Sequence, residues 1–514
     1  MQKNMQKNIQ KTYKRGAYKM IRTRYAPSPT GFMTIGNLRA ALFEYLIAKH
    51  EGGIFILRIE DTDQSRYVEG SEDAIYETLR LTGLSYDEGP HVGGDYGPYI
   101  QSQRKADYLP PALRLIKEGR AYYCFCDKDR LESLADERGI KKYDRYCLGL
   151  PEDEIAAKLA SDTPYVIRQL IPEGKTSFKD QVFGEITIDN AEMEDQILIK
   201  SDGMPTYNFA NVVDDNAMAI THVVRGCEYL TSTPKYILLY KALGWEVPVF
   251  VHLPLLVNES GQKISKRNGD ASVPQLLEMG FLPEAIVNYG ALLGWSPTGN
   301  EEIFTLPELI SIFKTSNISK SPSTFDLKKM TWVNGEHIKR LPAESFHALA
   351  LPYLQAAVKT PGTDYTRLAA ITQPRVSFVK DAAELVDFID SLPEYDIELY
   401  THKKMKTDPA IATVTLQLAT TALEQLPEDN WNHTAIGETI TKLAEESGTA
   451  STASGSEPNS NKAYSKGQFL WPIRTALSGK ATTPCGATEI AELLGKAESL
   501  QRLKTGLKKL EARF

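Results

Sequence analysis

The first part of this chain predicts a parallel α/β fold, because residues 21–59 contain a complete strand, helix, strand unit. Residues 21–26 (IRTRYA) read as a short strand, and the PSPTG sequence that follows predicts a turn. Apolar residues then recur at helical spacing from Leu38 onward, with Asn37 as the expected N-cap. The IFILRI run at residues 54–59 is typical of a buried parallel strand. The unit therefore predicts the start of a doubly wound sheet.

The rest of the chain continues this pattern with one interruption. Residues 105–205 show strand-like runs at 165–170 and 186–188, and we expect an inserted domain between two halves of the sheet. The α/β pattern resumes with a strand, a helix and a strand at residues 222–225, 234–243 and 249–252. Helical patterns occur at residues 72–81, 282–295, 306–313, 346–354, 382–392, 410–423, 434–445 and 488–513. A low-complexity polar loop at residues 449–461 interrupts the helical half.

Composition limits the class of protein. The chain has 514 residues, 42% hydrophobic and 24% charged, as in globular proteins of several domains. No apolar run reaches the ~18 residues of a transmembrane helix, so no membrane partner is expected. The five cysteines are too few for a disulfide framework and indicate a cytoplasmic protein. The net charge of −7 conceals nine Lys and Arg without any acid in residues 1–43, so charge alone does not identify the partner.

Two loops have the composition of a nucleotide site. The turn at residues 27–36 precedes a helix whose free N–H groups suit a phosphate, although many such turns bind nothing. The KISKR sequence at residues 263–267 follows a polar turn and places three cations and a hydroxyl within five residues. Such lysines can neutralise a polyphosphate, and the alternative is a solvated basic turn.

Together the two loops resemble the signature motifs of class I aminoacyl-tRNA synthetases. The sequence TIGN at residues 34–37 corresponds to the HIGH-like motif, and KISKR corresponds to the KMSKS-like motif. Other segments resemble glutamyl-tRNA synthetases, namely RYAPSPTG (24–31), RIEDTD (58–63), SYDEGP (85–90), PTYNFANVVDD (205–215), RGCEYLTSTP (225–234) and WPIRTALSG (471–479). The resemblance extends from about residue 21 to the C-terminus.

The resemblance implies an α/β Rossmann-type catalytic domain with an inserted α+β acceptor-binding domain, followed by an all-α anticodon-binding region. The expected segments are a disordered basic tail (1–20), the first half of the catalytic domain (21–104), the inserted acceptor-stem-binding domain (105–205), the second half of the catalytic domain (206–262), a KMSKS-loop and stem-contact region (263–335) and a helical anticodon-binding domain (336–514).

The resemblance also implies the reaction, which is ATP-dependent ligation of L-glutamate to tRNA(Glu) through glutamyl-adenylate, by a cytoplasmic monomer that uses ATP and Mg²⁺. The implied glutamate-binding residues are Arg24, Ala26, Ser28, Glu60, Tyr207, Asn211 and Arg225. The implied ATP-binding residues are Pro27, Ile35, Gly36, Asn37, Glu228, Tyr229, Lys263, Ser265 and Lys266. The implied catalytic residues are Thr34, Lys263 and Lys266.

One residue departs from the family pattern. The family normally has His at the first position of the HIGH-like motif, where this chain has Thr34. Thr can donate a hydrogen bond but cannot be cationic. Three outcomes are open: the enzyme is slower, another group takes the place of the missing His, or activation of the amino acid by ATP is lost. We expect that activity is retained. The alternatives are a catalytically impaired paralogue that binds tRNA or adenylate, and a small adenylate-forming enzyme acting on a tRNA base, whose relatives lack the anticodon half.

Two further groups are implied by resemblance. Cys124, Cys126 and Cys147 lie close together in sequence and suggest a zinc knuckle, for which Tyr143 is the candidate fourth ligand. The alternative is a set of three reduced structural thiols. Arg375 matches an arginine that reads an anticodon base in the family, and the alternative is a surface arginine.

Overall fold

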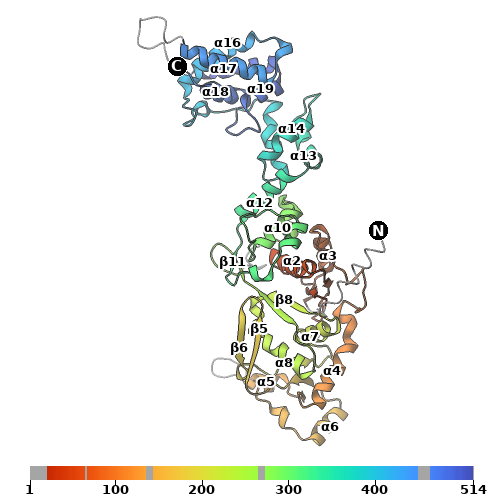
Figure 1. Ribbon diagram of the computed structural model, residues 1–514. Helices are drawn as coiled ribbons and strands as arrows, with labels where there is room; N and C mark the ends of the chain where they lie inside the picture. Colours follow the sequence, from red (N-terminus) through yellow and green to blue (C-terminus); the bar gives the residue numbers. More distant parts are fainter. Residues whose placement is uncertain (1–19, 64–65, 135–142, 264–271, 450–463, 513–514) are drawn as a thin grey trace, which may run out of the picture. The chain divides into compact units, whose positions relative to one another are not determined.

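The computed structural model describes residues 20–63, 66–134, 143–263, 272–449 and 464–512 (Figure 1). The tail at residues 1–19, most of the polar loop at 449–461, and both Ser265 and Lys266 lie outside the described residues. The chain forms two compact units, Met1–Val333 and Asn334–Phe514. Among the described residues, no helix combines the length and the apolar character needed to cross a bilayer.

The predicted strand, helix, strand unit is present as β1 (Arg22–Tyr25), α2 (Ile35–His50) and β2 (Ile54–Leu57). The two strands are parallel. Helix α2 begins earlier than expected, because Thr34 is its N-cap instead of Asn37. The Thr34 hydroxyl accepts a hydrogen bond from the Asn37 amide at 3.3 Å.

A second parallel pair continues the sheet, namely β8 (His222–Gly226) and β9 (Val249–Leu253). The Thr221 amide donates to the Arg22 carbonyl at 2.9 Å, which joins β8 to β1. Helices α3 (Ser71–Leu81), α7 (Tyr207–Ala217) and α8 (Thr233–Ala242) belong to the same unit. The predicted doubly wound arrangement is therefore confirmed.

The segment predicted as an insertion contains one sheet of its own and a hairpin that joins the sheet of β8 and β9. Its helices and strands are α4 (Lys105–Lys117), β3 (Ala121–Cys124), α5 (Lys128–Ser133), α6 (Glu152–Ala160), β4 (Val166–Gln169), β5 (Lys175–Asp180), β6 (Gly184–Asp189) and β7 (Ile197–Ile199). Strands β3, β4 and β7 form an antiparallel sheet. The β5–β6 hairpin, labelled in Figure 1, pairs instead through β5 with β9, where Asp180 lies opposite Phe250. The sequence analysis missed β5, because its inward positions include the polar Thr176 and Asp180.

The first unit ends with short elements, which are β10 (Leu256–Val257), α9 (Val273–Met279), α10 (Pro283–Leu292), α11 (Leu306–Ile312), β11 (Ser323–Thr324) and the first part of α12 (Leu327–Arg340). Strands β10 and β11 pair in parallel.

The described part of the second unit is helical and contains no strand, which agrees with the predicted all-α region. Its helices are α13 (Ala343–Ala357), α14 (Tyr365–Thr372), α15 (Ala382–Val386), α16 (Pro409–Glu424), α17 (His433–Thr449), α18 (Lys466–Ser478), α19 (Ala487–Leu494) and α20 (Lys496–Glu511). The single helix expected at residues 488–513 is in fact α19 and α20. Gly495 separates them with φ of +77°, which ends a right-handed helix.

The core of the second unit provides a matched pair of leucines on α16. Leu416 is fully buried and Leu418 is 40% exposed. We expect Leu416→Ala to lower the free energy of unfolding of this unit by about 2–5 kcal/mol and Leu418→Ala to change it by less than about 0.5 kcal/mol. Hydrogen exchange of the α16–α20 amides measures both changes. Equal effects of the two variants would contradict the packing described.

Candidate functional site

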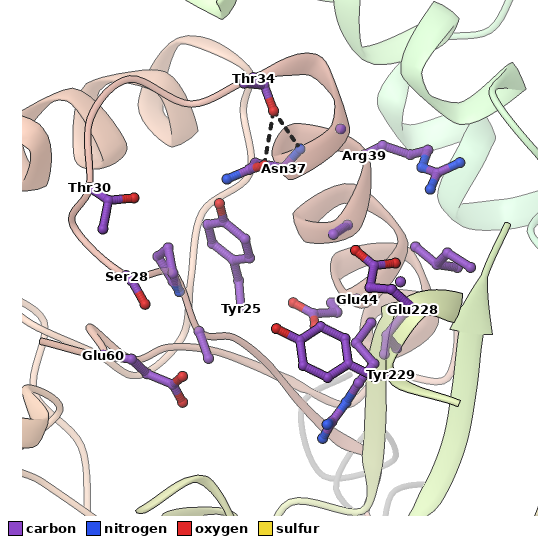
Figure 2. Close-up of a pocket in the computed structure, with 18 of the residues that line it drawn as sticks. Tyr25, Ser28, Thr30, Thr34, Asn37, Arg39, Glu44, Glu60, Glu228 and Tyr229 are labelled. Atoms are coloured by element: carbon purple, nitrogen blue, oxygen red, sulfur yellow. Dashed lines mark hydrogen bonds between the residues drawn. The ribbon is translucent and has the colours of Figure 1, made fainter. Parts of the chain in front are cut away.

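A pocket of about 680 Å³ lies at the carboxyl ends of β1, β2 and β8 and at the N-terminus of α2. Ligands bind open α/β sheets at this edge. Figure 2 shows its walls, which are formed by the loop after β1 (Ser28, Thr30), by α2 (Asn37, Glu44) and by the 3-10 turn η5, Cys227–Tyr229 (Glu228, Tyr229). The predicted phosphate turn and the two halves of the sheet therefore share one cavity.

Most of the predicted site residues line this pocket. They are Arg24, Ala26, Pro27, Ser28, Thr34, Gly36, Asn37, Glu60, Tyr207, Arg225, Glu228, Tyr229 and Lys263. Ile35 and Asn211 do not line it, since both side chains are buried behind its wall. Ser265 and Lys266 lie outside the described residues.

Three residues of the pocket wall, Arg24, Glu44 and Glu60, belong to a network of buried ion pairs around Asp215. Its Oδ1 atom lies 3.0 Å from Arg24 Nε and 2.8 Å from Arg58 Nη1. Arg24 also pairs with Glu44 at 3.2 Å, and Arg58 pairs with Glu60 at 2.8 Å. Burial favours the neutral acid, but Arg24 and Arg58 outweigh it and lower the pKa of Asp215. Arg24 is thus neutralised within the protein before any ligand binds.

The two carboxylates at the edge of this network behave differently from Asp215. Burial raises the pKa of Glu60 against the opposing effect of Arg58, and it raises the pKa of Glu44 well above its usual range. One oxygen of each, Oε2, is buried without a hydrogen-bond partner. Asn211 Nδ2 donates to the other oxygen of Glu60 at 3.1 Å.

Arg225 has a different environment from Arg24, although both line the pocket. Its guanidinium lies over the rings of Tyr236 and Tyr229, at 4.5 Å and 5.2 Å from their centroids. Its Nε and Nη1 atoms are buried without a hydrogen-bond partner, and Nη2 has a long contact of 3.4 Å with Asn211 Oδ1. In the described ranges no carboxylate forms an ion pair with it. The site therefore contains a desolvated cation that lacks a counter-ion.

The structure brings the two predicted motifs together. Thr34 and Ser272, which follows the KISKR segment, form an antiparallel bridge, and the Val273 amide donates to the Met33 carbonyl at 2.9 Å. Lys263, the first residue of KISKR, lies 3.3 Å from Glu228 at the pocket edge. The Thr34 hydroxyl donates to Asn37 Oδ1 at 2.9 Å (Figure 2). Lys263 at the start of the second motif, and Ser272 five residues beyond that motif, thus lie beside residues of the pocket.

The sequence analysis missed several residues of the pocket wall, among them Tyr25, Arg39 and Glu44. One signal could have identified Glu44. The stretch ALFEYLIA leaves α2 without a polar face there, so a carboxylate within it must be buried and must have a cation nearby. Arg39 donates to the carbonyls of Leu293 and Pro254, which a local pattern cannot reveal.

The three clustered cysteines converge as predicted from their spacing. The sulfur atoms of Cys124, Cys126 and Cys147 all lie within 4.8 Å of one another. The Tyr143 hydroxyl lies 3.2 Å from Cys124 Sγ and 3.7 Å from Cys126 Sγ. Three sulfurs and one oxygen therefore lie close together. Four donors are the number that a tetrahedral metal site requires.

Arg375 lies in the second unit, at the end of the 3-10 turn η8 (Gln373–Arg375) that follows α14. Its side chain is exposed, and no carboxylate in the described part of that unit forms an ion pair with it. A solvent-facing arginine of this kind is available to an external acceptor.

Comparisons with known proteins agree over nearly the whole chain. The model of the catalytic domain of class I tRNA synthetases (E and Q) matches residues 20–332, and an anticodon binding domain matches residues 345–507. Glutamate–tRNA ligases of Clostridium novyi and Clostridium botulinum are each 52% identical to 96% of this chain, over 99% and 100% of their own lengths. A solved glutamate tRNA ligase from Elizabethkingia meningosepticum, in complex with its amino acid, has a TM-score of 0.81 at 33% identity, covering 96% of this chain and 100% of that one.

The Asp215 network makes a prediction about stability. We expect Asp215→Asn to lower the free energy of unfolding of the first unit by about 3–5 kcal/mol, because it leaves two buried arginines undercompensated. Glu302→Gln, at a partly exposed pair with Lys329, should cost about 0–1 kcal/mol. Urea unfolding measures both.

The pH dependence of Asp215→Asn follows from the depressed pKa of Asp215. A carboxylate with a depressed pKa stabilises the fold above its unfolded pKa of about 3.9, and the stabilisation is lost as pH falls through the folded value. The difference between wild type and variant should therefore be constant near neutral pH and shrink below about pH 4. A constant difference down to lower pH would contradict this assignment.

Proposed function

The chain belongs to the glutamate–tRNA ligase family of class I tRNA synthetases, and on that premise we propose the substrates and the roles of the predicted site residues. The reaction class is ligation of an amino acid to tRNA. We propose that the amino acid is L-glutamate, that ATP first activates it as glutamyl-adenylate, and that the glutamyl group then passes to tRNA(Glu).

The observation that carries the choice of glutamate is the state of Arg225. A buried guanidinium without a counter-ion is costly, and an incoming carboxylate removes that cost by forming a bidentate pair. Glutamine would place a neutral amide there and would leave the cation unpaired. Arg225 therefore selects the side-chain carboxylate of glutamate over the amide of glutamine.

The other end of the amino acid fits the acidic part of the pocket. Glu60 Oε2 has no partner and can accept a hydrogen bond from the α-ammonium group. Asn211 contacts both Glu60 and Arg225, so it holds the two ends of the substrate site at a fixed spacing. Arg24, already paired with Asp215 and Glu44, lines this part of the pocket beside the bound amino acid. Ala26, Ser28 and Tyr207 complete this part of the wall.

ATP occupies the remaining part of the pocket in this proposal. The N-terminus of α2, with Gly36 and Asn37, faces the phosphates, and Pro27, Glu228 and Tyr229 line the nucleoside region. Attack of the glutamate α-carboxylate on the α-phosphorus expels pyrophosphate, whose charge Lys263 and Lys266 neutralise. The carboxylates Glu44 and Glu60 are already paired with arginines, so Mg²⁺ would be held through the ATP phosphates and water.

The second unit and the inserted domain are proposed to bind tRNA. The helical unit matches an anticodon binding domain, and the exposed Arg375 is a reader of base-edge acceptors within it. Residues 105–205 are proposed to bind the acceptor end. No observation favours the impaired paralogue.

The main test is steady-state aminoacylation with glutamate and tRNA(Glu). We expect Arg225→Gln to raise the KM for glutamate at least about 100-fold, since it removes a charge-assisted bidentate pair worth about 3 kcal/mol. Arg80→Gln, at an exposed pair with Glu77, is the control and should have no effect. If Arg225→Gln retained the wild-type KM for glutamate, Arg225 would not be the side-chain ligand.

A second test addresses Thr34. We expect Thr34→His to retain the rate of tRNA-dependent ATP–pyrophosphate exchange or to raise it, up to about tenfold, because a cationic donor can stabilise the charge that develops on the phosphates. Thr34→Val should lower the rate, since it lacks both the donor and the N-cap. A collapse of activity in Thr34→His would show that the site is built around threonine.

The cysteine cluster is proposed to hold a structural Zn²⁺, with Cys124, Cys126, Cys147 and Tyr143 as ligands, because their donor atoms converge on one point. Bound there, the metal would link β3 to the segment around Cys147. The alternative is a set of reduced thiols without metal.

Metal analysis of the purified chain decides between these alternatives. We expect about one zinc per chain after dialysis, a large loss of zinc in Cys126→Ser, and no loss in Cys485→Ser, which lies outside the cluster. Zinc far below one equivalent in the wild type would leave the reduced thiols as the correct description.

A further inference from the structure

A buried histidine and a buried aspartate lie outside the pocket and have no role in the reaction described above. They are His252 on β9 and Asp180 on β5, and His252 Nδ1 lies 2.7 Å from Asp180 Oδ2. The His252 side chain is fully buried, and Asp180 is 1% exposed. Buried ionisable groups are costly and call for a physical reason.

Asp180 is held by donors from both sides of the contact. Its Oδ1 atom accepts from the amides of Val182 and Phe183, and its Oδ2 atom accepts from the His252 amide as well as from the His252 ring. Asp180 belongs to the β5–β6 hairpin, and its carboxylate thus holds the end of β9 in place through His252. It also fixes the ring, because a carboxylate can only accept and Nδ1 must therefore carry a proton.

The other ring nitrogen leads toward the pocket. His252 Nε2 lies 3.1 Å from the hydroxyl of Thr233, the first residue of α8. The same hydroxyl lies 2.8 Å from the Tyr229 carbonyl, so it contacts both acceptors and donates its one proton to the carbonyl or to Nε2. The Ser232 hydroxyl donates to the same carbonyl at 3.0 Å. Thr233 is thus the partner of Tyr229 that connects it to the hairpin, whereas Ser232 is a local partner.

Tyr229 is the last residue of η5, the turn that also carries Glu228 into the pocket (Figure 2). Its ring lies next to the Arg225 guanidinium, with a centroid distance of 5.2 Å. Leu253, which directly follows His252 in sequence, lines the pocket as well. A displacement of the Asp180–His252 pair would therefore move two parts of the same wall.

We propose that Asp180, His252 and Thr233 are positioning residues that set the place of the η5 turn in the ATP part of the pocket and couple it to the β5–β6 hairpin. The proposal rests on the assignment of Tyr229 to ATP in the proposed function. None of the three residues touches substrate. They act through the Tyr229 carbonyl and the end of β9, so the inserted segment contributes to ATP binding without lining the pocket.

The test is a double-mutant cycle in aminoacylation by the full chain with tRNA(Glu). Thr233→Val removes the hydroxyl at constant shape, and we expect a five- to tenfold rise in the KM for ATP, with kcat and the KM for tRNA within about twofold of wild type. Asp180→Asn should raise the KM for ATP similarly. The double variant should be no worse than the worse single variant, because both changes break the same connection.

Matched controls separate positioning from general destabilisation. Ser232→Ala removes a hydrogen bond to the same Tyr229 carbonyl that does not involve Asp180 or His252. The factor by which it raises the KM for ATP should therefore multiply with the factor of Asp180→Asn in the double variant. Thr78→Val makes the same change at a buried threonine of α3, whose hydroxyl bonds only a helix carbonyl, and should leave the KM for ATP unchanged. Thr233→Ser keeps the hydroxyl and should restore the wild-type KM for ATP.

A second variant covers the case in which Asp180→Asn does not fold. His252→Asn keeps a polar group near the Nδ1 position but does not reach Thr233, so its KM for ATP should match that of Thr233→Val.

Two outcomes would overturn the proposal. One is a KM for ATP in Thr233→Val equal to that in Thr78→Val at equal thermal stability. The other is full multiplication of the Thr233→Val and Asp180→Asn effects. Either result, obtained while Arg225→Gln still raises the KM for glutamate, would reject the positioning role and leave the proposed function intact. A wild-type chain that charges no tRNA(Glu) would reject the proposed function itself.

Discussion

The buried carboxylate of Asp215 is the interaction on which the positions of Arg24 and Arg58 beside the pocket depend. It is 1% exposed at the end of α7 and pairs with Arg24 from β1 and with Arg58 just after β2. A buried charge that loses its partner costs several kcal/mol, so these three elements cannot shift independently. The two halves of the sheet, which lie far apart in sequence, are therefore held together by ion pairs beside the pocket.

The same network explains why one arginine is available and the other is not. Arg24 has two carboxylate partners, whereas Arg225 lies over aromatic rings and has a long contact with Asn211. The buried carboxylates Asp215, Glu44 and Glu60 are thus paired with Arg24 and Arg58, whereas no carboxylate among the described residues is paired with Arg225. In the proposed function such a site would discriminate by charge, because a neutral isostere would leave Arg225 unpaired.

The inserted segment is more closely joined to the catalytic sheet than a simple insertion would be. Strand β5 pairs with β9, and the Asp180 carboxylate accepts hydrogen bonds from β9 and from its own turn. This contact lies one hydrogen-bonded step from Thr233 and two from Tyr229. The inserted segment and the pocket wall at Tyr229 are therefore joined by a short series of buried polar contacts.

The sequence by itself determined the first strand, helix, strand unit, the helical second half, the two signature motifs and the family, because these depend on local periodicity and on short segments with characteristic composition. It placed Arg24, Glu60 and Arg225 in one site, but it could not tell that Arg24 is neutralised and Arg225 is not. It missed Glu44, β5 and the break at Gly495, where a polar residue faces inward or a single backbone angle changes the chain direction. Only the tertiary structure decided which charges are paired, because the pairs Arg24–Asp215 and Asp180–His252 join residues distant in the chain, and burial sets the energy of each pair.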